Sequence, residues 1–300
     1  GPSAIWTSGN VYKMAMPLYG RIALFETRNS SFHDWNLSNL EFYANSSGPS
    51  EFFPLPARIE GTEDFPTPYT HVLAGVAPTK PHSLGTPWYT LGRYDAKTGS
   101  FSETTPPAPL DASDKLIFAQ LHMDAGRMLF MGWFNVGNSC LTVPREIRYD
   151  PRQPALLALP AQELQSLRGA SLGTHRDTAI AAGSALALFS QVANTTSFDV
   201  ELTVTLPPGK AVEFVLAVMA SSVNNTEITV HIASAGQIVT VATTSSGDSR
   251  LSSKATFRMP DSTSLPIRVL ADRTVAEIFV ANGRTAVTSA VVEPGRDPNR

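Results

Sequence analysis

Carboxylates, histidines and one cysteine are the side chains of this sequence that could do chemistry, and their spacing shows no familiar catalytic pattern. Two acidic pairs, Glu63-Asp64 and Asp111 with Asp114, lie in Pro- and Ser-rich segments, where we expect them to be solvated. Neither a Gly-x-Ser-x-Gly motif nor a phosphate-binding loop occurs in the sequence. The six histidines show no metal-ligand spacing, so we expect core or surface positions for them and predict no metal or other cofactor. They are His33, His71, His82, His122, His175 and His231.

Cys140 is the single cysteine in 300 residues, so no disulfide can form within the chain. We expect a buried, inert thiol, and pairing with a cysteine of another chain stays open. A chain without disulfides is typical of a reducing compartment. Five Asn-x-Ser/Thr acceptors indicate the opposite, because they carry glycans in secreted proteins, and their number favours a secreted or cell-surface protein. The acceptors are Asn29, Asn36, Asn45, Asn194 and Asn224.

Composition narrows the class of protein. The net charge of -3 leaves no basic stripe interleaved with aromatic side chains, so nucleic acid is not an expected partner. No apolar run approaches the ~18 residues that cross a bilayer, so no membrane span is predicted. Hydrophobic residues make up 42% of the chain, which is enough for one large β domain or two smaller ones.

Short apolar runs bounded by Gly, Pro, Asn and Ser predict β-strands throughout the first half. Turn sequences such as Gly9-Asn10 and Lys97-Thr98-Gly99 separate them. The short spacing suits a sandwich, a barrel or propeller blades of four strands each. The predicted strands are Val11 to Met16, Arg21 to Thr27, His71 to Ala77, Trp88 to Asp95, Lys115 to Met123 and Arg127 to Phe134.

One helix is predicted, from Pro160 to Gly169, with Pro at its start, Gly at its end, and Leu164 and Leu167 on one face. A lone helix in a β-rich chain is a natural linker between domains. After it, alternating strands dominate: "SFDVELTVTL", from Ser197 to Leu206, places five apolar side chains on one face. The Asn282-Gly283 pair predicts a hairpin turn, so the second half is expected to form an antiparallel sandwich.

Five motifs occur in an order that resembles glycoside hydrolase family 32, the invertases and β-fructofuranosidases. They are "YTLGRYDAKTGSF", "RMLFMGWF", "LTVPREIRYD", "LPAQELQSLR" and "IRVLADRTVAEIFVANGRTAVTS". The resemblance implies an all-β fold: part of a five-bladed β-propeller, about three blades, followed by an antiparallel β-sandwich. It implies propeller blades over residues 1–159, a linker helix over 160–169 and the sandwich over 170–300.

The resemblance also implies a retaining mechanism, in which two carboxylates ~5 to 5.5 Å apart serve as nucleophile and acid/base. The family's nucleophile lies in a Trp-x-Asn-Asp-Pro-Asn-Gly motif, which this sequence lacks. Its transition-state Asp lies in an Arg-Asp-Pro motif, and Pro2 to Trp6 resembles the residues just after that Asp. We therefore expect the chain to begin at the third blade of such a propeller.

The stretch "SSGPSEFFPLP", from Ser46 to Pro56, resembles the site of the family's acid/base Glu. Aligned on the two phenylalanines, Gly48 occupies the acid position and Glu51 the position of a non-catalytic Asp. Glu51 could replace the acid only after a shift of three residues, which would turn its side chain to the opposite face of the strand. Trp133 is a candidate sugar-binding residue by its match in the family, although blade core is the commoner place for such a Trp. Met131 stands where the family often has another Trp.

Three functions remain open from the sequence. The first is a non-catalytic, invertase-like, secreted or surface protein that binds a glycan or a protein. The second is an active β-fructofuranosidase, acting on sucrose or fructans, whose N-terminal catalytic half is not in this chain. The third is a structural subunit that completes a propeller with another polypeptide, because open blade edges and faces need cover.

Overall fold

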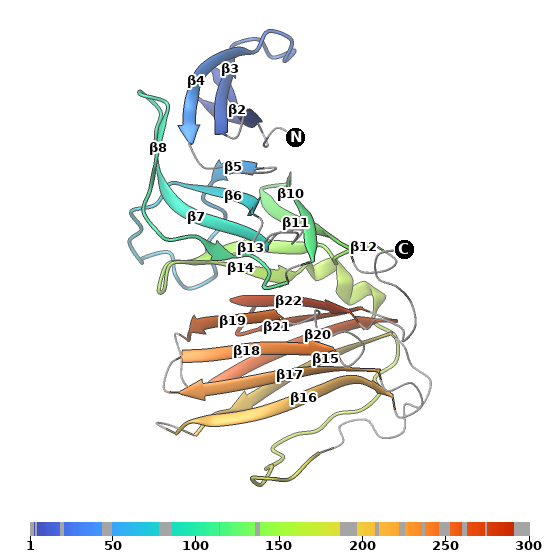
Figure 1. The fold of residues 1–300 in the computed structure, drawn as a ribbon. Helices are drawn as coiled ribbons and strands as arrows, with labels where there is room; N and C mark the ends of the chain where they lie inside the picture. The colour runs from blue at the N-terminus through green and yellow to red at the C-terminus, as the bar shows by residue number, and fades with distance from the viewer. Residues whose placement is uncertain are drawn as a thin grey trace.

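The computed structural model has an all-β fold (Figure 1). The part of the chain that it describes contains twenty-two strands and one short 3₁₀ helix. Figure 1 shows blade-like sheets at one end of the molecule and a pair of longer sheets at the other. The described residues are 3, 5–18, 21–43, 50–77, 86–113, 115–135, 139–186, 197–207, 210–221, 226–235, 238–245, 253–259, 263–273 and 275–290.

Three antiparallel sheets form the first half. In each, four strands pair in chain order, and two of the sheets have a fifth, short strand beside these four. Blade one is β1 (Trp6–Ser8), β2 (Val11–Leu18), β3 (Arg21–Thr27) and β4 (Asn36–Tyr43). Blade two is β5 (Ser50–Pro54), β6 (His71–Ala77), β7 (Thr86–Asp95) and β8 (Ser100–Glu103), with β9 (Ala108–Pro109) paired to β7. Blade three is β10 (Leu116–Asp124), β11 (Arg127–Phe134), β13 (Arg145–Asp150) and β14 (Ala155–Pro160), with β12 (Cys140–Leu141) paired to β11. The prediction of about three four-stranded blades is confirmed.

Blade two packs against both blade one and blade three. It can do so because successive side chains of a strand point to opposite faces of the sheet. On β5, Phe52 packs with Trp6 and Leu24 of blade one. Its neighbour Phe53 belongs to the cluster that contains Phe130 and Tyr149 of blade three. Strands β5, β6 and β7 each contribute side chains to both hydrophobic layers.

The predicted linker helix is shorter and tighter than expected. It is a single 3₁₀ helix, η1 (Gln162–Leu167), with no buried residue. Leu164 is half-buried but Leu167 is 79% exposed, so the expected apolar face of the two is only partly packed. Six residues make too little of an amphipathic surface to dock, and hydrogen bonds of the 3₁₀ type, such as Leu164 N to Ala161 O, close the turns.

Two four-stranded sheets form the second half, in the orders β15-β20-β21-β22 and β16-β17-β18-β19. Their facing side chains make one hydrophobic core. Phe198, Leu202 and Val204 pack against this core, which confirms the predicted apolar face of β15. The strands are β15 (Ser197–Thr205), β16 (Val212–Ser221), β17 (Thr226–Ala235), β18 (Ile238–Ser245), β19 (Ser253–Arg258), β20 (Ser264–Asp272), β21 (Val275–Val280) and β22 (Thr285–Ala290).

The β21–β22 hairpin touches blade three directly. Its turn covers residues 281–284, and Asn282 and Gly283 both have positive φ (55° and 76°), as the Asn-Gly pair predicts. A Cβ on Gly283 would lie 2.3 Å from the carbonyl oxygen of Ala158 in β14. The Ala158 N–H donates to the Gly283 carbonyl at 2.8 Å, so only glycine allows this approach.

Candidate functional site

Glu51 lies on β5, opposite Ala74 of β6, and its residue is half-buried. Gly48, which stands in the acid position of the resemblance, lies outside the described residues. The assignment of Gly48 to the acid position and of Glu51 to that of a non-catalytic Asp stays a prediction, with Glu51 as a weak candidate for the acid. What the structure adds is its neighbour Phe52, fully buried between blades one and two, which fixes the strand that carries Glu51.

The outer face of blade three carries exposed apolar side chains. On β11, Phe130, Gly132 and Phe134 are buried, while Met131 and Trp133 are 40% and 44% exposed on the opposite face. Trp133 is therefore not blade core, which corrects the expectation for most such residues. Its cross-strand partner in β12, Leu141, is 65% exposed.

We call Met131, Trp133 and Leu141 the blade-three patch. Its strand is firmly held, because the Thr142 hydroxyl accepts from the Gly132 N–H at 2.9 Å and the Thr142 N–H donates to the Gly132 carbonyl at 2.9 Å. The patch is thus an exposed apolar surface on a hydrogen-bonded part of the sheet.

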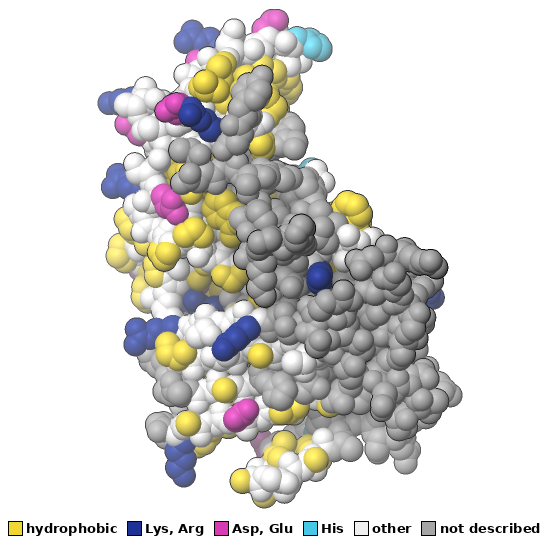
Figure 2. Space-filling model, in the orientation of Figure 1, with side chains coloured by type: hydrophobic (Ala, Val, Ile, Leu, Met, Phe, Trp, Pro, Cys, Tyr) yellow, Lys and Arg dark blue, Asp and Glu magenta, His cyan; other side chains and the backbone are white. Residues whose placement is uncertain are grey.

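Blade one also exposes apolar side chains. Phe32, Leu37 and Leu40 are 41%, 48% and 41% exposed. Figure 2 shows hydrophobic side chains gathered at the end of the molecule that Figure 1 assigns to this blade. The two outer blades of the described set therefore both present apolar surface to solvent.

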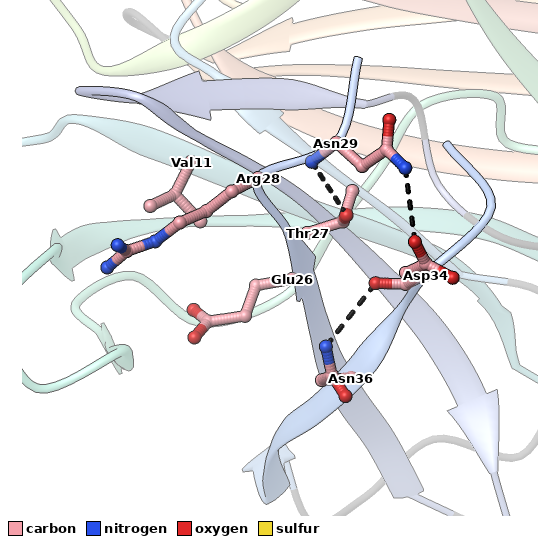
Figure 3. Close-up of a pocket in the computed structure, with 7 residues that line it drawn as sticks. All are labelled: Val11, Glu26, Thr27, Arg28, Asn29, Asp34 and Asn36. Atoms are coloured by element: carbon pink, nitrogen blue, oxygen red, sulfur yellow. Dashed lines mark hydrogen bonds between the residues drawn. The ribbon is translucent and has the colours of Figure 1, made fainter. Parts of the chain in front are cut away.

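A polar hollow of about 340 Å³ lies at the end of blade one (Figure 3). Two predicted glycan acceptors line it: the Asn29 amide donates to Asp34 Oδ2 at 3.1 Å, and the Asn36 amide donates to the Asp34 carbonyl oxygen at 3.3 Å. The other acceptors, Asn45, Asn194 and Asn224, lie outside the described residues. The complete lining is Val11, Glu26, Thr27, Arg28, Asn29, Asp34 and Asn36.

A buried ion cluster joins blade three to the sandwich. Arg145 of β13 is fully buried and donates to Asp111 Oδ2 at 2.7 Å and to Glu277 Oε2 at 2.6 Å. Thr288 of β22 accepts from Arg145 at 2.8 Å and donates to Asp111 at 2.7 Å. Asp111 is 1% exposed, so the expectation of a solvated carboxylate was wrong for this residue.

Burial raises the pKa of the Glu277 carboxyl, and the Arg145 guanidinium opposes that shift. Both carboxylates are held by Arg145 and closed off from water, so neither is placed to meet a substrate. The cluster is a structural junction. Of the other predicted acidic residues, Glu63 and Asp64 are exposed as expected, and Asp114 lies outside the described residues.

Cys140 is half-buried rather than fully buried, and burial raises the pKa of its thiol. A raised pKa lowers the thiolate fraction at neutral pH and so lowers reactivity.

His71 stacks on Phe52, with ring centroids 4.9 Å apart, and burial lowers its pKa to about 4. Within the described residues, no group of three or more His, Cys, Asp or Glu side chains could hold a metal ion. No helix in that part of the chain is long and apolar enough to span a membrane.

Comparison with known proteins gives one family match and several similar solved structures. Residues 163–299 match the family described as Glycosyl hydrolases family 32 C terminal. No curated protein sequence matches the chain significantly. The solved structure of fructan 1-exohydrolase IIa from Cichorium intybus superposes with a TM-score of 0.64 and 15% identity, over 98% of this chain and 66% of that one.

Two further solved structures give the same result. Sucrose-6-phosphate hydrolase from Lactobacillus gasseri has a TM-score of 0.65 and 15% identity, over 99% of this chain and 61% of that one. Fructosyltransferase from A. japonicus has a TM-score of 0.68 and 14% identity, over 95% and 62%. This chain thus spans less than two thirds of the length of each of these three, and at these identities the likeness establishes a shared fold.

Proposed function

We propose, on the premise that residues 163–299 belong to the C-terminal domain of family 32 glycosyl hydrolases, that this chain is a non-catalytic, invertase-like binding module. The observation that supports it best is the blade-three patch, in which Met131, Trp133 and Leu141 stand exposed on a rigid sheet. The partner that we propose is a protein with an apolar surface.

The non-catalytic part of the proposal rests on missing chemistry. Retaining hydrolysis needs a nucleophile and a general acid, and each is indispensable. The family's nucleophile motif is not among these 300 residues, and Gly48 stands at the position of the acid. Asp111 and Glu277 are committed to Arg145. Glu51 remains the candidate acid that an assay must exclude.

The choice of a protein partner rests on the composition of the patch. A sugar site combines an aromatic ring with convergent polar groups, whereas protein hot spots combine aromatic and aliphatic side chains that lose water together. Trp133 has Met131 and Leu141 as its exposed neighbours, and both are apolar. A glycan stacked on the Trp133 ring is the competing reading of the same surface.

Site-specific photo-crosslinking in the native host tests the proposal. A photoreactive phenylalanine analogue replaces Met131 in one protein and Leu172 in a control, because Leu172 is 52% exposed but lies in the irregular segment after η1. We expect one discrete protein adduct from position 131 that is lost when Trp133 is changed to Ala. Adducts of equal pattern from both positions, or no adduct from either, would contradict the proposal.

Trp133 fluorescence distinguishes a glycan ligand from a protein partner. If sucrose or inulin shifts the emission of the wild-type protein and the shift disappears in Trp133→Phe, the patch is a sugar site and the protein partner is wrong. We expect no such shift.

Two other functions each have one observation in favour. The likeness to fructan 1-exohydrolase IIa over 98% of this chain favours an active fructosidase completed by N-terminal blades. The apolar surfaces on both outer blades favour a structural subunit that closes a propeller with another polypeptide. A structural subunit would self-associate or precipitate alone, so sedimentation of the isolated chain as a stable monomer would count against it.

We also propose that the protein is secreted or held at the cell surface, because Asn29 and Asn36 are both exposed acceptors. Intact mass of host-derived protein before and after glycosidase treatment tests this. A mass loss of whole glycans is expected, and an unchanged mass would contradict an exported location.

A further inference from the structure

We propose that the polar hollow of blade one binds a neutral polyhydroxylated ligand, such as a single sugar ring, through a pair of adjacent hydroxyl groups. This site differs from the blade-three patch in position and in chemistry. It goes beyond the proposed function, which concerns an apolar protein partner, and it can stand or fall separately.

The hollow is built on a fixed frame. Glu26 ends in a carboxylate whose Oε2 accepts from buried Lys13 at 3.2 Å. Asn29 is held from two sides, since its backbone N–H donates to the Thr27 hydroxyl at 3.0 Å and its amide donates to Asp34. Lys13 and Thr27 are themselves buried, which fixes the floor on which the exposed groups stand.

Several groups of the lining keep unused hydrogen-bonding capacity. Figure 3 shows the Arg28 and Glu26 side chains extending to the same side of β3. Within the described residues no hydrogen bond or ion pair occupies the Arg28 guanidinium, and Glu26 uses one carboxylate oxygen for Lys13. Asn36 donates through its amide nitrogen, which leaves its amide oxygen as an acceptor. The hollow therefore presents donors and acceptors together.

The charges of the hollow favour a neutral ligand. Of the lining residues, Arg28 is positive and Glu26 and Asp34 are negative. Lys13 lies outside the lining but pairs with Glu26, so the four formal charges cancel. A cation would meet Arg28, and an anion would meet the two carboxylates. Each hydroxyl of a sugar both donates and accepts, so two adjacent hydroxyls can bond to a guanidinium and a carboxylate at once.

The size of the hollow is consistent with a small ligand. Its volume of about 340 Å³ lies at the lower end of the range of small-molecule sites, about 300–1,000 Å³. A glycan attached to Asn29 or Asn36 would start from the lining itself and compete for the same space. The experiment therefore uses protein made in a bacterial host without N-glycosylation.

Saturation-transfer difference NMR provides the test, with D-fructose, D-glucose and D-mannose as probes and 1,6-hexanediol as the control that lacks adjacent hydroxyls. We expect saturation of at least one sugar and none of the diol. Arg28→Gln should lower the sugar signal at least about fivefold, since hydrogen bonds to a charged group are stronger than those between neutral groups. Asp34→Ala should lower it as well, because it removes the carboxylate that holds the Asn29 amide.

Two control variants locate the binding. Arg93→Gln removes an exposed arginine of blade two and should leave the signal unchanged. Trp133→Ala should also leave it unchanged, so that loss of the photo-crosslinked adduct and loss of sugar binding are separate results. The inference is overturned if no sugar is saturated, if Arg28→Gln binds as wild type does, if Trp133→Ala abolishes the signal, or if citrate or calcium displaces the sugar.

Discussion

The face of blade three that meets the sandwich and the face that meets solvent use opposite kinds of contact. On the inner side, Arg145 binds Asp111 and Glu277 with all three side chains buried. On the outer side, Trp133 and Leu141 stand exposed with no covering layer among the described residues. The inner face is satisfied by this chain alone.

The difference indicates which of the two faces is already covered within this chain. A buried charge without its partners costs several kcal/mol, so the junction at Arg145 must form in the native fold. Exposed apolar side chains cost much less, so the outer face can persist in the isolated chain and gain free energy when something covers it. The blade thus has one face buried against the sandwich and one exposed apolar face, which is the face that we propose binds a partner.

Loss of Glu277 should give the largest effect. Glu277→Ala leaves Arg145 short of one carboxylate and frees the Val143 N–H that donates to Glu277 at 2.6 Å. We expect a loss of about 3–5 kcal/mol in the free energy of unfolding, measured by urea titration. Glu201→Ala is the matched control, since Glu201 is 56% exposed and bonds to exposed Arg168, and should cost about 0–1 kcal/mol. If the two variants lost the same free energy of unfolding, the buried junction would stabilise the fold no more than an exposed ion pair does.

Gly283→Ala should cause the next largest loss in the free energy of unfolding. The added Cβ meets the Ala158 carbonyl oxygen at 2.3 Å and must also adopt a φ of 76°. Gly61→Ala isolates the second cost, because Gly61 has a φ of 74° and nothing within 4 Å of its Cβ position. We expect about 1–2 kcal/mol for Gly61→Ala and a further 1–3 kcal/mol for Gly283→Ala, from thermal or urea unfolding. If the two variants lose the same free energy, the close approach of β14 does not matter.

The packing of His71 on Phe52, between blades one and two, should make the stability of the protein depend on pH. His71 stacks on Phe52, and burial lowers its pKa to about 4 in the folded state, against about 6.5 when unfolded. Between these values the unfolded chain binds more protons, so stability falls as pH drops from 6.5 to 4. We expect His71 to account for about 1–2 kcal/mol of that fall, because partial exposure weakens the effect.

The difference between wild type and His71→Phe isolates this contribution from that of other groups. Unfolding at pH 7 and pH 4.5 should show a smaller pH dependence in the variant. A dependence of the same size in both proteins would place the acid sensitivity elsewhere.

Trp133→Ala should have the smallest effect on stability, within about 0.5 kcal/mol, because the side chain is exposed. Phe130→Ala lies on the same strand with its side chain fully buried and should cost about 3–5 kcal/mol. Urea unfolding of both variants measures the contrast between the two faces of β11. A large loss in Trp133→Ala would mean that the outer face is already covered in solution.

Much of the fold could be predicted from the sequence, because apolar runs and turn residues are local signals. Arg21–Thr27, His71–Ala77 and Arg127–Phe134 have the predicted bounds. The exposure of Trp133 could be predicted only in part. Its alternation with Phe130 and Phe134 puts it on the other face, but no local signal tells whether a neighbour covers that face.

The ion cluster could not be predicted from spacing. Asp111 lies 34 residues from Arg145, and Glu277 lies 132 residues from it, so only the tertiary fold brings them together. An arginine inside an otherwise buried strand was the available signal, since a buried charge requires partners. The hollow of blade one could not be predicted either, because its lining comes from three strands and the loop between β3 and β4, and the sequence marks Asn29 and Asn36 only as glycan acceptors.

Hydrolysis is the most direct test of the non-catalytic reading. Release of fructose from sucrose and inulin is measured at high concentration of the wild-type chain and of Glu51→Gln. We predict no release above the buffer blank in either protein, because the chain lacks the family's nucleophile motif and has Gly48 where the acid is expected. Clear release by the wild type that disappears in Glu51→Gln would contradict the account and show that Glu51 acts as the acid.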